Sequence, residues 1–174
     1  MTSSEHVVLV GMMGSGKTTV GRAVAARLHR PFFDSDELVE ARTGRTVRDI
    51  FETDGEAAYR PLEADALLDA LASPEPAVIA AAGGVVIAAA NREALAKPGA
   101  KVFWLQAAPH LLAERAVTGD HRPLLDGDPE GNLGRLLAGR EDLYAEVADC
   151  VLAVEGRTVD ELVGEVIQVM DGVP

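Results

Sequence analysis

Residues 11–18 read GMMGSGKT and directly follow the apolar run HVVLV at residues 6–10. This is the pattern of a P-loop, a glycine-rich turn between a buried strand and a helix. The glycines allow successive backbone N–H groups to point at one phosphate chain, and the following helix presents its positive end to the same anion. We expect Lys17 to reach the β- and γ-phosphates and Thr18 to offer its hydroxyl to Mg²⁺. The sequence therefore predicts a nucleotide phosphate site; the alternative is a glycine-rich turn without a ligand.

Further short apolar runs predict the other strands of the fold. The five predicted strands cover residues 6–10, 31–33, 77–81, 101–105 and 150–154. Each run is nearly continuous in apolar character, which is typical of strands buried on both faces, and segments with helical spacing separate the runs. This alternation predicts an α/β fold, in which a five-stranded parallel sheet is flanked by helices on both sides.

Length and charge limit the class of protein. A chain of 174 residues fits one domain and can bury a core without disulfides, and its single cysteine, Cys150, permits no internal one. The formal net charge of −12 argues against nucleic acid and membrane surfaces as partners, and an anionic substrate would need a local cluster of arginines. Since neither a membrane span nor a signal peptide is visible, we expect a cytoplasmic protein. We further expect its partners to be small molecules and the protein to be a monomer.

Two aspartates, Asp34 and Asp36, directly follow the second predicted strand. Residues two apart on an extended chain project to the same face, so both carboxylates are expected at the carboxyl edge of the sheet, where open α/β sheets bind ligands. One carboxylate can help to hold Mg²⁺, and the other can orient or deprotonate an attacking hydroxyl. The alternative for Asp36 is an N-cap on a helix over residues 37–42.

The order of motifs along the chain resembles that of the shikimate kinases, a family of small-molecule P-loop kinases. The resemblance is carried by GMMGSGKTTVG at 11–21, FDSD at 33–36, RTGRTVRDIF at 42–51 with DGE at 54–56 and YR at 59–60, RPLL at 122–125, and REDLY at 140–144. The P-loop alone is common to many kinases, whereas the ordered set is specific. The resemblance implies a P-loop NTPase fold of the nucleoside-monophosphate-kinase type, with a single kinase domain over 1–174, a helical substrate-binding insert at about 34–62 and a mobile lid at about 115–129.

The resemblance also implies an activity, the phosphorylation of shikimate at its 3-hydroxyl by ATP with Mg²⁺, which gives shikimate 3-phosphate and ADP. Asp36 would bind ring hydroxyls and activate the attacking one, and the guanidinium groups of Arg60 and Arg140 would hold the carboxylate. The implied catalytic residues are Lys17, Asp36 and Arg122; the nucleotide-binding residues are Gly14, Ser15, Gly16, Lys17, Thr18, Thr19, Arg115 and Arg122; the substrate-binding residues are Asp36, Arg60, Gly83, Gly84 and Arg140; and the metal ligands are Thr18 and Asp34.

Three residues depart from the family pattern, all on the substrate side. Ala82 replaces the first of three consecutive glycines, and alanine would cost roughly 1 kcal/mol or more if the position requires a positive φ. Pro61 follows Arg60 directly, so either Arg60 lies near a helix start or its direction differs from that in relatives. Tyr59 replaces the usual phenylalanine and adds a hydroxyl.

Two other functions stay open at this point. A related kinase could act on another small polyhydroxy acid or a cyclitol, as gluconate-type kinases do. A nucleotide-binding protein without catalysis could serve as a switch, although the charged groups of a working kinase, Lys17, both aspartates and Arg122, are all present. A GTPase-type enzyme would need a fuller Walker B strand and guanine-reading residues, which the sequence lacks.

Overall fold

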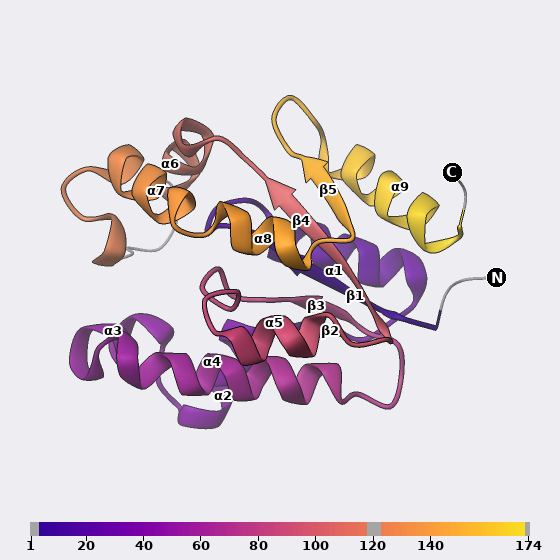
Figure 1. The fold of residues 1–174 in the computed structure, drawn as a ribbon, viewed down its shortest axis with the longest axis horizontal. Helices are drawn as coiled ribbons and strands as arrows, with labels where there is room; N and C mark the ends of the chain where they lie inside the picture. The colour runs from indigo at the N-terminus through magenta and orange to yellow at the C-terminus, as the bar shows by residue number, and fades with distance from the viewer. Residues whose placement is uncertain (1–3, 118–122, 173–174) are drawn as a thin grey trace.

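The computed structural model describes residues 4–117 and 123–172 (Figure 1). Its strands are β1 (His6–Val10), β2 (Phe32–Asp34), β3 (Val78–Ala80), β4 (Ala100–Gln106) and β5 (Cys150–Ala153). Its helices are α1 (Lys17–Leu28), α2 (Ser35–Thr43), α3 (Val47–Asp54), α4 (Glu56–Leu71), α5 (Ala89–Leu95), α6 (Pro109–Val117), α7 (Pro129–Ala138), α8 (Glu141–Val147) and α9 (Val159–Met170), with a short 3₁₀ helix η1 (Pro123–Leu125). Within these residues no helix is both long and apolar enough to cross a membrane.

The five strands form one parallel sheet in the order β2-β3-β1-β4-β5, which confirms the predicted fold class. Strand bounds differ from the prediction by one residue at most; β2, for example, includes Asp34, because this residue pairs with Ala80. β1 lies in the middle of the sheet, and its residues Val7 to Val10 are fully buried. The chain runs from β1 out to β2, returns to β3 and then crosses to β4, so the direction of winding reverses beside β1. Ligands bind parallel α/β sheets at such a switch point.

Helices flank the sheet, and α2, α3 and α4 lie together on one side of it (Figure 1). α1 packs against α9, and α5 packs against α4 and α8. α2, α3 and α4 form a separate lobe, which has its own small core of Val39, Ile50, Tyr59 and Ala66. β4 points toward the end of the molecule where α6 and α7 lie, so the carboxyl ends of the parallel strands are at that end (Figure 1).

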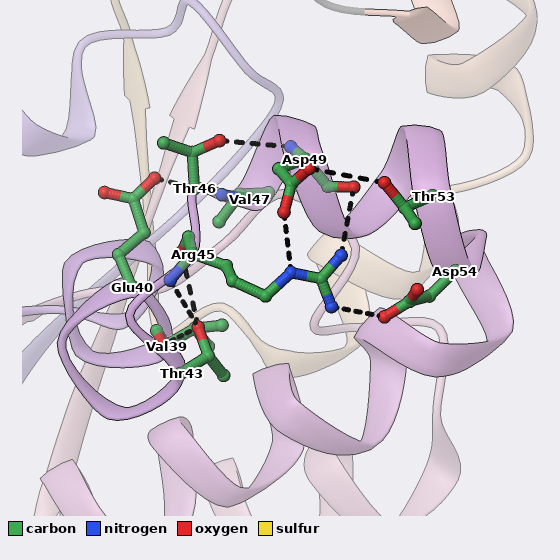
Figure 2. A network of polar contacts seen from close by, with 9 residues as sticks. All are labelled: Val39, Glu40, Thr43, Arg45, Thr46, Val47, Asp49, Thr53 and Asp54. Atoms are coloured by element: carbon green, nitrogen blue, oxygen red, sulfur yellow. Dashed lines mark hydrogen bonds and ion pairs between the residues drawn. The ribbon is translucent and has the colours of Figure 1, made fainter.

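A network of polar contacts holds α3 within the lobe, and Figure 2 shows it from close by. Arg45 bridges both ends of α3, with Nε 2.6 Å from Asp49 Oδ2 and Nη1 2.5 Å from Asp54 Oδ2. Thr46 caps the helix by accepting the backbone N–H of Asp49 at 3.1 Å, and the Glu40 carboxylate accepts the N–H of Val47 at 3.0 Å. Exposed ion pairs contribute little individually. Their joint effect is to fix the orientation of α3, which lines the site described next.

Candidate active site

Two adjoining cavities open at the carboxyl edge of the sheet. The first, of about 440 Å³, contains the P-loop residues 13–19, and the second, of about 630 Å³, lies between the sheet and α2, α3 and α4. The residues common to both cavities are Met13, Thr18, Asp34, Asp36, Ala82 and Gly83. A group bound in one cavity can therefore meet a group bound in the other along a wall that carries both aspartates.

The first cavity has the features of a phosphate site. Gly14 and Gly16 adopt φ of 80° and 99°, which turn the chain around the start of α1, and no side chain caps that helix. Lys17 donates from Nζ to the carbonyls of Gly11 and Met12 at 2.8 and 2.9 Å. Ser15 is only 1% exposed, and its hydroxyl has no hydrogen-bond partner among the described residues. An uncapped helix start beside a buried, unsatisfied hydroxyl is suited to an anionic ligand.

Thr18 and Asp34 meet at the boundary between the cavities. The Thr18 hydroxyl donates to Asp34 Oδ2 at 2.6 Å. The other oxygen, Oδ1, accepts the backbone N–H groups of Asp36 and Glu37 at 2.9 and 3.3 Å, so Asp34 is the N-cap of α2. The alternative that assigned this cap to Asp36 is therefore wrong. An oxygen pair beside a phosphate site fits Mg²⁺, which proteins commonly bind through one or two oxygen ligands and the phosphates themselves.

Asp36 lines both cavities, but it lies on a helix and not on the extended chain from which this position was predicted. The expectation that both aspartates lie on extended chain is wrong for Asp36, because α2 begins at Ser35, immediately after β2. Its carboxylate faces α4, where the Tyr59 hydroxyl donates a hydrogen bond to Oδ1. The hydroxyl that distinguishes Tyr59 from phenylalanine thus contacts the residue expected to activate the substrate.

Arg60 and Arg140, the two arginines expected to hold the carboxylate, both line the second cavity, but their surroundings differ. Arg60 Nη1 lies 2.9 Å from the Glu63 carboxylate, and the guanidinium also pairs with Glu56. Arg140 is 5% exposed and forms no ion pair with a carboxylate of the described residues, but its side chain contacts the Tyr144 hydroxyl, and its charge offsets part of the rise that burial causes in the pKa of the Glu63 carboxyl. A buried guanidinium without such a pair is the cation best placed to receive an anionic substrate.

Glu63 is a functional candidate that the sequence analysis missed. It is 1% exposed and lines the second cavity; burial raises the pKa of its carboxyl above the ordinary value, and the nearby Arg60 charge offsets only part of this rise. Burial lowers the pKa of Arg60, but Glu63 and then Glu56 outweigh it, so that the pKa of this guanidinium is raised. The spacing of Glu63 from Arg60, three positions along a helix, is the signal that could have identified it.

The glycine loop after β3 lies directly under the two arginines. A Cβ on Gly84 would lie 1.8 Å from Arg60 Nη1, and one on Gly83 would lie 3.7 Å from Arg140 Nη1. Ala82 does not adopt a positive φ, and its N–H donates to the Ser35 hydroxyl at 2.8 Å. Its methyl group therefore causes none of the backbone strain that a positive φ would impose.

Pro61 is the sixth residue of α4, and Arg60 is the fifth. The alternative that places Arg60 and Pro61 at the helix start is therefore not met, because Pro61 lies inside α4, beyond its first turn. The proline removes one hydrogen bond from the second turn, where Gly55 with φ of 84° has already separated α4 from α3.

We expect Gly84→Ala to raise KM for the substrate of the second cavity at least tenfold, because the added methyl group displaces the Arg60 guanidinium. Steady-state kinetics with each substrate varied in turn measure this effect. Gly134→Ala is the matched control, since a Cβ there meets no atom within 4 Å, and alanine in a helix stabilises by about 1 kcal/mol relative to glycine. Unchanged kinetics for Gly84→Ala would mean that Arg60 does not contact the substrate.

The far wall of the first cavity combines residues that are distant in sequence. Arg115 on α6, expected to bind the nucleotide, donates from Nη1 to the carbonyl of Gly14 at 3.1 Å and lines the cavity. The sequence analysis missed the residues that follow β5 and line the same cavity, namely Val154, Arg157, Val159 and Leu162. Their place after a strand of the sheet is the available signal, since carboxyl ends of parallel strands share one edge.

Arg122, which the resemblance implies is a catalytic and nucleotide-binding residue, falls outside the described residues. Of the predicted lid motif, Leu124 lines the second cavity, and η1 contacts α3. Among the described residues, no group of three or more His, Cys, Asp and Glu side chains could hold a metal ion.

Comparisons with known proteins agree on one family. The family model described as shikimate kinase matches residues 13–171. A curated shikimate kinase of Symbiobacterium thermophilum is 48% identical over 166 residues, which cover 94% of this chain and 94% of that protein. The solved shikimate kinase from Acinetobacter baumannii, in complex with shikimate, has a TM-score of 0.90 at 37% identity and covers 97% of this chain and 93% of its own. A gluconokinase from Sinorhizobium meliloti 1021 has a TM-score of 0.69 at 25% identity, covering 99% and 95%.

Proposed function

The chain belongs to the shikimate kinase family, and from this premise we propose how its residues carry out the reaction. The activity is ATP-dependent phosphorylation of shikimate. The observation that carries the assignment of roles is the wall common to both cavities, which brings Thr18, Asp34 and Asp36 between a phosphate site and an arginine-lined pocket. We assign the nucleotide to the first cavity and shikimate to the second.

On the nucleotide side, the P-loop residues 14–19 bind the phosphates through backbone N–H groups and the Lys17 ammonium. Lys17 now donates to carbonyls of its own loop, so binding exchanges these contacts for the β- and γ-phosphates. Arg115, with Arg157 and Val159, is proposed to contact the base or ribose. Thr18 and Asp34 would hold Mg²⁺, which when bound supplies positive charge that offsets the charge developing on the transferred phosphoryl group.

On the substrate side, the proposed region is about 34–62 together with the glycine loop and Arg140. Arg140 and Arg60 hold the shikimate carboxylate, and the N–H groups of Gly83 and Gly84 approach the ring. Asp36 accepts a hydrogen bond from the 3-hydroxyl and takes its proton as the oxygen attacks the γ-phosphorus, while the bond from that phosphorus to the β,γ-bridging oxygen breaks and ADP leaves. Arg122 is proposed to add a cation at the phosphates, and a monomer suffices for this site.

A coupled assay of ADP release tests the substrate assignment. With MgATP and shikimate, quinate, gluconate or a cyclitol without a carboxylate, we expect turnover with shikimate and at least 10²-fold lower kcat/KM with the cyclitol, because an unpaired buried Arg140 charge costs several kcal/mol. Preference for gluconate or quinate would retain the kinase and replace its substrate. ATP binding without turnover on any of the four would favour a nucleotide-binding switch.

A further inference from the structure

Tyr59 connects the substrate-binding helix α4 to the start of α2. Its hydroxyl donates to Asp36 Oδ1 across 23 positions of sequence, and the residue is 3% exposed. Tyr59 therefore lies between two residues of the substrate pocket. Arg60 follows it on α4, and Asp36 lies on the wall shared with the nucleotide cavity.

The ring of Tyr59 is held on several sides. The Phe51 ring lies 4.7 Å away between centroids at an angle of 42°, and the Arg60 guanidinium carbon lies 5.7 Å from the Tyr59 centroid. The ring also belongs to the small core of the lobe, with Val39, Ile50 and Ala66. Because the ring is fixed by packing, the direction of the hydroxyl is fixed with it, and a carboxylate that accepts from it loses rotational freedom.

The Tyr59 hydroxyl acts as a hydrogen-bond donor to Asp36 and not as a second general base. Burial raises the pKa of Tyr59 far above its ordinary value, and the Asp36 charge raises it further. The phenol therefore stays protonated at neutral pH and can donate to the carboxylate. A donor whose direction is fixed by packing stabilises one orientation of the carboxylate that accepts from it, and hydrogen bonds to charged groups are stronger than those between neutral groups.

We propose that Tyr59 is a positioning residue of the phosphoryl transfer, which orients the Asp36 carboxylate toward the attacking hydroxyl of the substrate through their hydrogen bond. The inference rests on the proposed role of Asp36. A positioning role predicts that loss of the Tyr59 hydroxyl lowers kcat and does not weaken substrate binding. The hydroxyl donates to Asp36, whereas the substrate carboxylate is proposed to bind to Arg60 and Arg140.

Tyr59→Phe removes only the hydroxyl and keeps the packed ring. We expect kcat to fall about tenfold while KM for shikimate and for ATP stays within twofold, and thermal unfolding to show a folded protein. A kcat within twofold of the unsubstituted protein, or a loss expressed mainly in KM, would overturn the proposal. Should Tyr59→Phe fold poorly, Phe51→Leu loosens the ring and keeps the hydroxyl; kcat is then expected to fall several-fold, and an unchanged kcat would overturn the proposal.

A double-mutant cycle separates positioning from a general structural role. In the Asp36→Asn background, Tyr59→Phe is expected to change the residual kcat less than twofold, because the carboxylate that it orients is absent. An equal tenfold loss in both backgrounds would show that Tyr59 acts independently of Asp36. The proposed role of Asp36 fails separately, if Asp36→Asn alone retains kcat within tenfold.

Tyr144→Phe is the matched comparison, since it removes the hydroxyl of the other tyrosine near the pocket. That hydroxyl donates to the carbonyl of Gly83 at 2.5 Å, on the substrate-binding loop. Its loss is expected to raise KM for shikimate with a smaller effect on kcat, the reverse of the pattern for Tyr59. The same pattern for both tyrosines would contradict a specific action on Asp36.

Discussion

Asp36→Asn is expected to lower kcat for shikimate phosphorylation by about 10³-fold, with smaller changes in KM. General-base catalysis contributes roughly 10²–10⁴-fold, and an amide can neither accept the proton nor attract it by charge. The substitution preserves shape, and Asn can still accept the hydrogen bond of Tyr59. Because Asp34 caps α2, the substitution leaves that cap intact, so the loss can be attributed to chemistry. Single-turnover measurement of ADP formation detects the remaining rate.

The neighbouring carboxylate on the same helix provides the control for Asp36. Glu37 lines the second cavity and pairs with Arg22, but it does not lie on the wall shared by the cavities. Glu37→Gln is therefore expected to keep kcat within about twofold, since exposed ion pairs contribute little. If Asp36→Asn reduced kcat less than tenfold, Asp36 would not be the group that activates the hydroxyl, and another acceptor would have to be sought.

Arg140→Ala is expected to raise KM for shikimate about 100-fold or more and to leave KM for ATP within about threefold. Losing one partner of a buried charge pair costs about 2–5 kcal/mol, which corresponds to roughly 30-fold to several thousand-fold in affinity. Arg140 is suited to this test because it is 5% exposed and, within the described residues, forms no ion pair that its removal would break. Its side chain also makes no capping bond to α8. Kinetics with each substrate varied at saturation of the other give both values.

Two further variants help to interpret the effect of Arg140→Ala on shikimate binding. Arg140→Lys keeps the charge but loses the planar pair of donors, so its KM for shikimate should lie between those of the unsubstituted protein and the alanine variant. Arg60→Ala is a poorer probe, because it would leave Glu63 buried without its partner and would reduce stability as well as binding. An equal loss of shikimate and ATP affinity in Arg140→Ala would contradict its assignment to the carboxylate.

Several features of the site were predictable because their signals are local in sequence. The P-loop needs glycines and a lysine at fixed spacing, and Gly14 and Gly16 adopt the positive φ values that such a turn requires. The strands were predictable because a strand covered on both faces is apolar nearly throughout, as β1 is from Val7 to Val10. Asp34 ends β2 and Asp36 comes two residues later, so the strand alone predicted that both lie at the carboxyl edge of the sheet, although it did not predict that α2 begins at Ser35.

Other features depend on which segments the fold brings together. Tyr59 donates to Asp36 because α4 packs against α2, and Arg140 meets the glycine loop because α8 lies beside β4, which neighbours β1. Arg157 and Val159 reach the nucleotide cavity only because β5 is the strand next to β4. The tertiary structure also decided two alternatives that the sequence left open. Asp36 is not the N-cap of α2, because Asp34 supplies that cap, and Ala82 is not strained, because it does not adopt a positive φ.

The sequence by itself determined the parallel sheet, the phosphate loop and the residue types available for chemistry, because backbone preference and burial periodicity act over a few neighbouring positions. Only the tertiary structure decided which residues of different segments touch: that Tyr59 donates to Asp36, and that Arg140 is buried beside the glycine loop. Such pairs form across layers, where helix packing and strand order set distances of a few ångströms, and no pattern within a single segment encodes that spacing.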